Sequence, residues 1–175
     1  MSKPYPHPAA IDPDELLKDC TIGRDRTRGP GGQHRNKVET GVFITHKPTG
    51  IKARGTEMRS QIKNKQRAIF RLRVRLALRY RTIPPIPGYQ PSALLAERLR
   101  QQKKKLVVNP KHQDFPAILA EVLDVVVALG GDVKKASEYL GIVSSSQFVK
   151  FLKTQREALT VVNAARKERG LHVLH

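Results

Sequence analysis

The chain is short of acidic residues and of cysteine. Its 175 residues include 15 Asp and Glu against 33 Lys and Arg, which gives a formal net charge of +18. A charge of this size indicates a polyanionic partner, and nucleic acid is the first candidate. The one cysteine, Cys20, excludes an internal disulfide. No thiol-enzyme motif surrounds it, so we expect a small buried residue there rather than a nucleophile.

Long apolar runs are missing too. No apolar stretch approaches the roughly 18 residues that a membrane span needs. The N-terminal sequence MSKPYPHPAAIDPDELL also lacks the apolar segment of a secretion signal. With no possible internal disulfide, this predicts a cytoplasmic protein that does not contact a membrane. The basic part of the chain shows no carboxylate pair, metal-ligand cluster or Ser/His/Asp arrangement, so we expect neither a metal nor a cofactor.

The positive charge is concentrated in one part of the chain. Residues 21–82 contain 17 Lys and Arg against three acidic residues, which is +14 of the total +18. Together with the proline-rich stretch IPPIPGYQP, this shift in composition predicts two units joined by a stiff linker. We therefore divide the chain into a disordered tail (1–18), a basic domain (19–82), the linker (83–91) and a helical domain (92–175).

The basic domain has the sequence pattern of an α+β fold. Residues 42–45 and 51–54 are rich in β-forming residues and flank the turn sequence KPTG, which predicts a hairpin. A short strand around residues 19–23 would add a third member to this antiparallel sheet. Because a hairpin alone is marginally stable, we expect a long basic helix over residues 59–81 to cover it.

The predicted helix has an apolar face and a cationic face. At about 100° per residue, the apolar face consists of Ile62, Ile69, Leu72, Leu76 and Tyr80. The opposite face consists of Lys63, Arg67, Arg71, Arg75 and Arg79. Such a row is often no more than a solvated helix face. Five cations at this spacing with no acidic partner repel one another, however, which favours an anionic surface as their partner.

The C-terminal part is predicted to be an all-α helical bundle. We expect four helices, which begin at Asp114 with Pro116 in the first turn, at Asp132, at Ser144 and at Arg156. The stretch GDVKKASEYLGIVSSSQFVKFLK, in the second and third helices, is similar to a helix-turn-helix pair. Such a pair is also found as a simple corner of a bundle. If it contacts nucleic acid, the contact would come from Gln147, Lys150 and Lys153.

A glycine-rich loop, RTRGPGGQHRNK, occupies residues 26–37. It lacks the Lys-Ser/Thr ending of a P-loop and the spacing of a dinucleotide fingerprint. The polar group that it presents is the amide of Gln33, which is a poor acid, base or nucleophile. The loop therefore looks built to place a backbone and a neutral hydrogen-bonding group where another molecule supplies the reactivity. The alternative is a flexible glycine turn without a function of its own.

Four ordered sequence pieces carry a resemblance to a known family. They are the tripeptide Gly31-Gly32-Gln33, its His34-x-Asn36 continuation, the turn TH-x-PTGI at residues 45–51 and the helix start RSQ-x-KNK at residues 59–65. This combination resembles the catalytic domain of class I peptide chain release factors, over roughly residues 19–82. The resemblance implies a small catalytic domain with a short antiparallel sheet and a long basic helix.

The resemblance also implies a chemistry for the loop, the hydrolysis of peptidyl-tRNA on the ribosome. Gly31 and Gly32 would allow a backbone shape that is closed to residues with a Cβ. The backbone N–H of Gln33 would stabilise the transition state while its side chain helps to select water, and ribosomal RNA would supply the rest of the site. His34 and His46 could be read as an acid/base pair, but polar residues that contact RNA or end a strand are favoured.

The chain departs from codon-reading release factors. Those proteins carry a PxT or SPF tripeptide in a large additional domain; neither tripeptide occurs here, and about 20 residues precede the catalytic part. The chain therefore resembles the codon-independent branch, the ribosome-rescue factors that release nascent peptides from stalled ribosomes. The best-known bacterial member ends in a disordered basic tail, whereas residues 92–175 look folded. The rival hypothesis is a nucleic-acid-binding regulator with a relict release-factor domain, against which the intact tripeptide argues.

On this interpretation the chain is a ribosome-dependent hydrolase that acts as a monomer. Its partners would be large-subunit ribosomal RNA and the peptidyl-tRNA in the P site, with no DNA. The expected catalytic residues are Gly31, Gly32 and Gln33. The expected RNA-binding residues are Arg26, Arg28, His34, Arg35, Asn36, Lys37, Arg59, Lys63, Lys65, Arg67, Arg71, Arg75, Lys103, Lys104, Lys105, Lys150 and Lys153.

Overall fold

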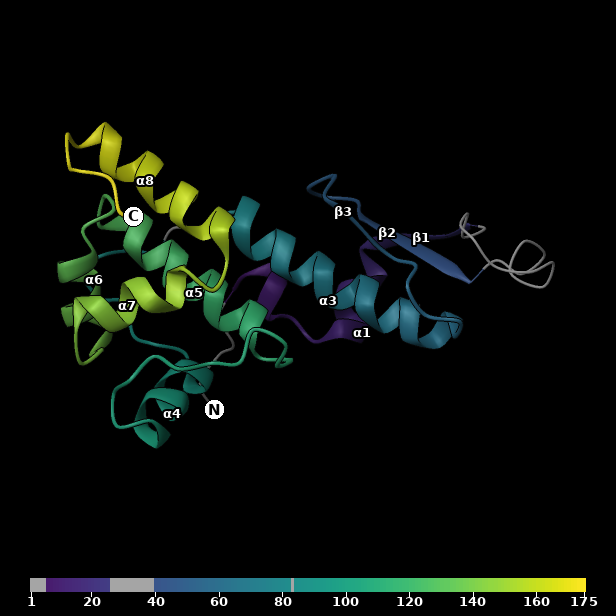
Figure 1. The fold of residues 1–175 in the computed structure, drawn as a ribbon, viewed down its shortest axis with the longest axis horizontal. Helices are drawn as coiled ribbons and strands as arrows, with labels where there is room; N and C mark the ends of the chain where they lie inside the picture. Colours follow the sequence, from purple (N-terminus) through teal and green to yellow (C-terminus); the bar gives the residue numbers. More distant parts are fainter. Residues whose placement is uncertain (1–5, 26–39, 83) are drawn as a thin grey trace.

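A three-stranded antiparallel sheet forms one end of the molecule (Figure 1). The computed structural model describes residues 6–25, 40–82 and 84–175. The strands are β1 (Cys20–Asp25), β2 (Gly41–His46) and β3 (Lys52–Gly55), in the order β1-β2-β3. The hairpin predicted from the KPTG turn is confirmed: Gly50 adopts a φ of +68° and its N–H donates to the carbonyl of His46 at 2.8 Å. The fold is α+β, as expected.

Helix α3 (Gln61–Arg79) covers one face of the sheet. Its N-cap is Ser60, whose hydroxyl accepts from the N–H of Lys63 at 3.4 Å. The helix approaches β3 so closely that a Cβ on Gly55 would lie 2.2 Å from the carbonyl oxygen of Asn64. Glycine at position 55 therefore allows helix and strand to pack directly against each other. The side chains buried between helix and sheet are Val42, Ile44, Ala53, Ala68, Leu72 and Leu76.

The predicted apolar face of α3 is only partly right. Leu72 and Leu76 are fully buried, but Ile62 is 71% exposed and Tyr80 is 41% exposed. Ile62 lies beside the edge strand β1, where it lines a shallow groove with Ile22, so no third layer covers it. Arg73, which no pattern singled out, is 8% exposed because α3 packs on both the sheet and the C-terminal helices.

The N-terminal residues are ordered from residue 6 onward, where we expected a disordered tail over residues 1–18. They form the 3-10 helix η1 (Pro8–Ala10) and helix α1 (Pro13–Lys18). His7 is completely buried: its Nδ1 accepts from the N–H of Ala9 at 3.0 Å, and its Nε2 lies 3.1 Å from the carbonyl oxygen of Tyr80. These bonds and the burial of Ala9 attach the segment to the end of α3, which explains its order.

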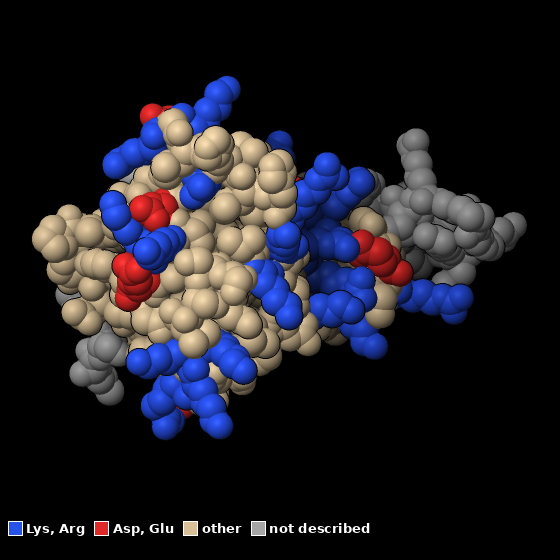
Figure 2. Space-filling view, turned by 60° about the vertical axis from the view of Figure 1, so that its left-hand side comes forward, with Lys and Arg blue, Asp and Glu red and all other residues tan. Residues whose placement is uncertain are grey.

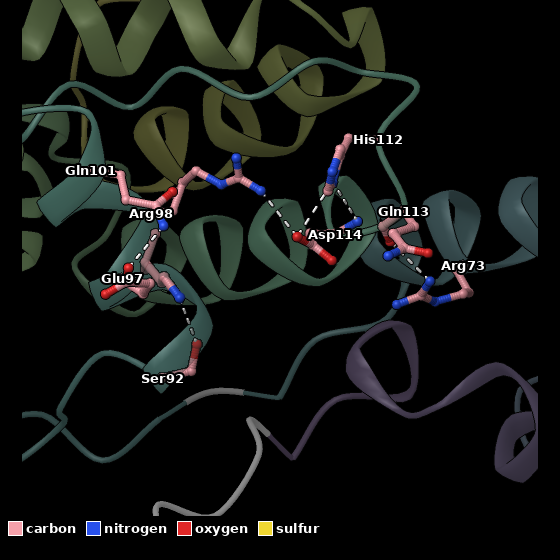
Figure 3. A network of polar contacts seen from close by, with 9 residues as sticks. Arg73, Ser92, Glu97, Arg98, Gln101, His112, Gln113 and Asp114 are labelled. Atoms are coloured by element: carbon pink, nitrogen blue, oxygen red, sulfur yellow. Dashed lines mark hydrogen bonds and ion pairs between the residues drawn. The ribbon is translucent and has the colours of Figure 1, made fainter.

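Five helices follow, and four of them lie where the sequence predicts helices. Asp132 and Ser144 act as N-caps as expected, and Gly141 ends its helix with a φ of +70°. Asp114 makes no capping bond; its carboxylate pairs instead with Arg98 at 3.0 Å (Figure 3). The helices are α4 (Ala93–Gln101), which was not predicted, α5 (Phe115–Ala128), α6 (Val133–Leu140), α7 (Ser145–Leu152) and α8 (Arg156–Glu168).

One continuous apolar core runs from the sheet to α8, with α5 buried at its centre between α3 and α8 (Figure 1). The proposed linker region is tied to α5 by the buried carboxylate of Glu121. Glu121 accepts from the backbone N–H of Ser92 at 2.6 Å and from the hydroxyl of Tyr89. Arg73 adds a tie across the core, because its guanidinium donates to the carbonyls of Ala9 and Gln113, each at 3.0 Å (Figure 3). The division at residues 83–91 remains a prediction about independent folding units.

Candidate functional site

The expected catalytic residues Gly31, Gly32 and Gln33 lie outside the described residues. So do six of the expected RNA-binding residues, namely Arg26, Arg28, His34, Arg35, Asn36 and Lys37. The structure does place the two strand ends that border this segment, because Asp25 at the end of β1 pairs with Gly41 at the start of β2. The segment therefore leaves and re-enters the sheet at one point.

Asn64 holds the chain just after this segment. It is completely buried, and its amide nitrogen donates to the carbonyls of Thr40 at 2.7 Å and Met58 at 2.8 Å. Its carbonyl oxygen accepts from the N–H of Met58 at 2.9 Å. The first turns of α3 are thus fastened to the start of β2. Sequence reasoning missed this residue, although its spacing of four residues from Ala68 and of eight from Leu72, both buried, was an available signal.

The cationic row of α3 lies along the free edge of β3. Arg71 donates to the carbonyl of Arg54 at 2.9 Å, and Arg75 donates to the carbonyl of Lys52. Both carbonyls lie at the unpaired edge of the sheet, where such groups otherwise invite association with another strand. Arg71 and Arg75 therefore cover the edge of the sheet in addition to contributing positive charge. The sequence did not indicate this structural role.

The expectation that this row has no acidic partners is wrong. Arg71 pairs with Glu57 at 2.5 Å, and this hydrogen bond lowers the pKa of Glu57 to about 2. Arg79 pairs with Glu157 at 3.6 Å. The remaining expected residues in this area are exposed, and Figure 2 shows Lys and Arg gathered on the part of the molecule that carries the sheet and α3. They are Arg59, Lys63, Lys65 and Arg67.

The expected lysine run at residues 103–105 forms the turn after α4. All three side chains are exposed, and Lys103 and Lys104 adopt positive φ angles of 50° and 63°. The carbonyl of Lys104 accepts from the N–H of Val143 at 2.9 Å, so the run lies against the turn between α6 and α7. Figure 2 shows a second gathering of cations at the lower edge of the molecule, at the level of α4.

Lys150 and Lys153 line a surface groove of about 660 Å³. The groove is bordered by α6, α7 and the C-terminal residues, and Lys134 and Arg166 also contribute to it. Asp132 is the acidic residue of its lining, and its carboxylate caps α6 by accepting from the N–H of Lys135 at 3.0 Å. The structure thus brings two expected RNA-binding groups, far apart in sequence, close to the turn between α6 and α7.

Two possible reactive residues, His46 and Cys20, form hydrogen bonds within the fold. His46 is 3% exposed, its Nδ1 lies 2.8 Å from the hydroxyl of Thr49, and burial lowers the pKa of its ring. The thiol of Cys20 donates to the carbonyl of Leu16 at 3.2 Å, and burial raises its pKa. The raised pKa reduces the thiolate fraction of Cys20, so this thiol is not poised for nucleophilic chemistry.

Within residues 6–25, 40–82 and 84–175, no cluster brings together three His, Cys, Asp or Glu residues that could hold a metal ion. No helix in the same residues combines the length and the apolar character that crossing a bilayer requires.

Three relatives show what the chain is similar to. It is 54% identical over 59 residues to the chloroplastic peptide chain release factor PrfB1 of Arabidopsis thaliana, which covers 34% of this chain and 13% of the relative. It is 36% identical over 108 residues to the mitochondrial peptide chain release factor 1 of Homo sapiens, covering 62% and 22%. With the Bos taurus form of that mitochondrial factor it shares 44% identity over 71 residues, covering 41% and 16%.

These matches span between 13% and 22% of the length of the three relatives. The RF-1 domain family matches residues 10–105, more than half of the chain. The matched range contains α1, the sheet, α3, α4 and the sequence Gly31-Gly32-Gln33. It also extends past the proposed linker. The chain therefore belongs to the class I peptide chain release factor family, through an RF-1 domain.

Proposed function

We propose that the chain hydrolyses the ester bond of peptidyl-tRNA on the ribosome, without reading a codon, and so releases nascent peptides from stalled ribosomes. The observation that carries this proposal is the tripeptide Gly31-Gly32-Gln33 inside an RF-1 domain match. The strands on either side of its segment pair at Asp25 and Gly41, so both ends of the segment are attached to the same end of the sheet. The relatives are release factors, which gives the regulator hypothesis no support.

In this proposal the chain supplies little of the reaction chemistry itself. Water adds to the ester carbonyl carbon, and the resulting tetrahedral species loses the ribose oxygen of the tRNA. The products are a peptide acid and a free tRNA hydroxyl. The backbone N–H of Gln33 donates to the developing oxyanion, because a preorganised donor stabilises the charge that forms only in the transition state. Ribosomal RNA completes the site, and no metal or cofactor takes part.

The codon-independent form of the activity is supported by the sequence. Neither a PxT nor an SPF tripeptide occurs within the 175 residues. The helices that follow the RF-1 domain instead present the lysine turn at residues 103–105 and the groove with Lys150 and Lys153. We propose that these two sites bind ribosomal RNA or the vacant mRNA channel, and that the chain works in the cytoplasm as a monomer.

Single-turnover peptide release from purified ribosomes tests the assignment of the loop. Gly32→Ala should slow release more than Gln33→Ala, because a Cβ at position 32 distorts the backbone whereas the change at position 33 leaves the N–H in place. Near-normal rates for both variants would remove the loop from the mechanism.

The same assay tests codon independence. Ribosomes that carry a stop codon, a sense codon or no mRNA in the A site are compared. We expect the fastest release with an empty A site. A tenfold preference for the stop codon, about 1.4 kcal/mol of discrimination, would show codon reading and contradict the proposal.

A further inference from the structure

The outer face of the sheet carries an exposed aromatic side chain. Helix α3 covers the face of β2 that contains Val42 and Ile44, both nearly or fully buried. Side chains alternate along a strand, so Phe43 lies on the opposite face, where it is 44% exposed. An exposed phenylalanine in the middle of a strand contributes little to the core and needs another explanation.

The ring of Phe43 lies across the neighbouring strand. Gly23 of β1 is its pairing partner, and a Cβ on Gly23 would lie only 2.1 Å from Cζ of the ring. Residue 23 therefore has to be a glycine for the ring to reach over β1. The end of the ring thus lies over Gly23 on the outer face of the sheet, and nearly half of the side chain remains exposed.

Cations flank the ring on the same face. Arg54 pairs with Phe43 from the other side, and Lys52 pairs with Thr45 two residues along β2. Because paired residues of an antiparallel sheet share a face, both cations lie on the outer face, and both are exposed. The backbone of β3 under them is held by Arg71 and Arg75, so the platform is rigid.

From this arrangement we infer that Phe43 is a stacking platform for an unpaired base of single-stranded RNA, with Arg54 and Lys52 contacting the adjoining phosphates. A flat aromatic face beside cations is how proteins bind single strands with little sequence preference, since every base has a π face and every nucleotide a charge. The choice of RNA as the strand rests on the proposed ribosomal partner. The proposed site uses none of residues 26–39 and consists of described residues alone.

The test uses a fluorescently labelled RNA octamer and a second octamer in which the bases are removed but the phosphates kept. Phe43→Leu should weaken binding of the intact RNA by about 5- to 150-fold, the range expected for one stacked base, and should leave binding of the abasic strand unchanged. Arg54→Gln should weaken both strands and reduce the slope of log affinity against log salt by about 0.7. Gly23→Ala should reproduce the Phe43→Leu result by lifting the ring.

A second measurement reports stacking directly. The chain contains no tryptophan, so Phe43→Trp introduces a single indole. Its fluorescence should be quenched by the intact RNA and not by the abasic strand. Unchanged RNA affinity in Phe43→Leu, or equal loss for both strands, overturns the inference and assigns the face to a protein contact. Because ribosomes are absent, this outcome is independent of the peptide-release assay.

Discussion

The carboxylate of Asp124 lies 2.7 Å from the guanidinium of Arg81, and Asp124 is completely buried. The second carboxylate oxygen accepts from the N–H of Thr82 at 3.1 Å. One acidic side chain in the middle of α5 thus fixes the path of the chain as it leaves α3. Because a buried charge that loses its partner is costly, this site connects the two halves of the molecule energetically as well as geometrically.

Removing this carboxylate should destabilise the whole protein. Asp124→Ala leaves Arg81 without this partner in a largely buried place, so we expect the free energy of unfolding to fall by about 3–5 kcal/mol. Urea denaturation measures the change. The control is Glu157→Ala, which breaks the exposed pair with Arg79 and should cost less than about 1 kcal/mol. Similar losses of unfolding free energy in the two variants would show that the buried pair stabilises the protein no more than the exposed pair does.

A chain that ends at residue 82 should fail to fold cooperatively. The sequence predicts that residues 19–82 form a unit of their own, but the far half of α3 packs against α5 and η1. Truncation would remove helix α5 and the carbonyl of Gln113, which accepts from the buried Arg73. We therefore expect no sigmoidal thermal transition by circular dichroism. A cooperative transition in the truncated chain would support the sequence-based division instead.

Stability should fall in mildly acidic solution because of His7. Burial lowers the pKa of His7 to about 4 from its usual value of 6.5. Between pH 6.5 and 4 the unfolded chain therefore binds a proton at His7 that the folded chain does not bind. The contribution of His7 to the free energy of unfolding is complete above pH 6.5 and is lost as the pH falls toward 4. The loss should reach up to about 3 kcal/mol. Denaturation of wild type and His7→Gln across pH 4–7 measures it, and parallel curves for the two proteins would contradict it.

The lysine turn should contribute to ribosome binding through charge. Lys103→Asn, Lys104→Asn and Lys105→Gln together remove three charges, and asparagine tolerates the positive φ at the first two positions. Each lost phosphate contact should reduce the slope of log affinity against log salt by about 0.7–0.9. Ribosome binding across a salt series measures this slope. Lys18→Gln, a neutralisation on exposed α1, should leave the slope as in wild type; an unchanged slope in the triple variant would argue for a protein partner.

Local sequence signals predicted much of the fold. The hairpin follows from the KPTG turn between β-forming stretches, and the helices α6 and α7 follow from the caps Asp132 and Ser144. These features depend on residues close together in the chain, so a sequence pattern contains them. The order of residues 6–18 does not have this property, because it depends on a bond between His7 and the distant Tyr80.

The candidate site was less accessible from the sequence. The cationic face of α3 could be predicted from its spacing, but not that Arg71 and Arg75 also cover the edge carbonyls of β3, since this requires helix and strand to be placed in three dimensions. The same holds for Phe43, whose exposure depends on which face of the sheet α3 covers. For Gly31, Gly32 and Gln33 the family resemblance remains the source of the assigned roles.

Helix α3 sets the separation between the sheet and the C-terminal helices. Its 19 residues amount to about 28 Å at about 1.5 Å per residue, and it is anchored to the sheet at one end and to α5 along the other. The end of the sheet at Asp25 and Gly41 and the turn between α6 and α7 are therefore held at a fixed position relative to each other, unlike two domains joined by a flexible linker. A partner surface that contacts both of these sites has to offer contact points at a matching separation.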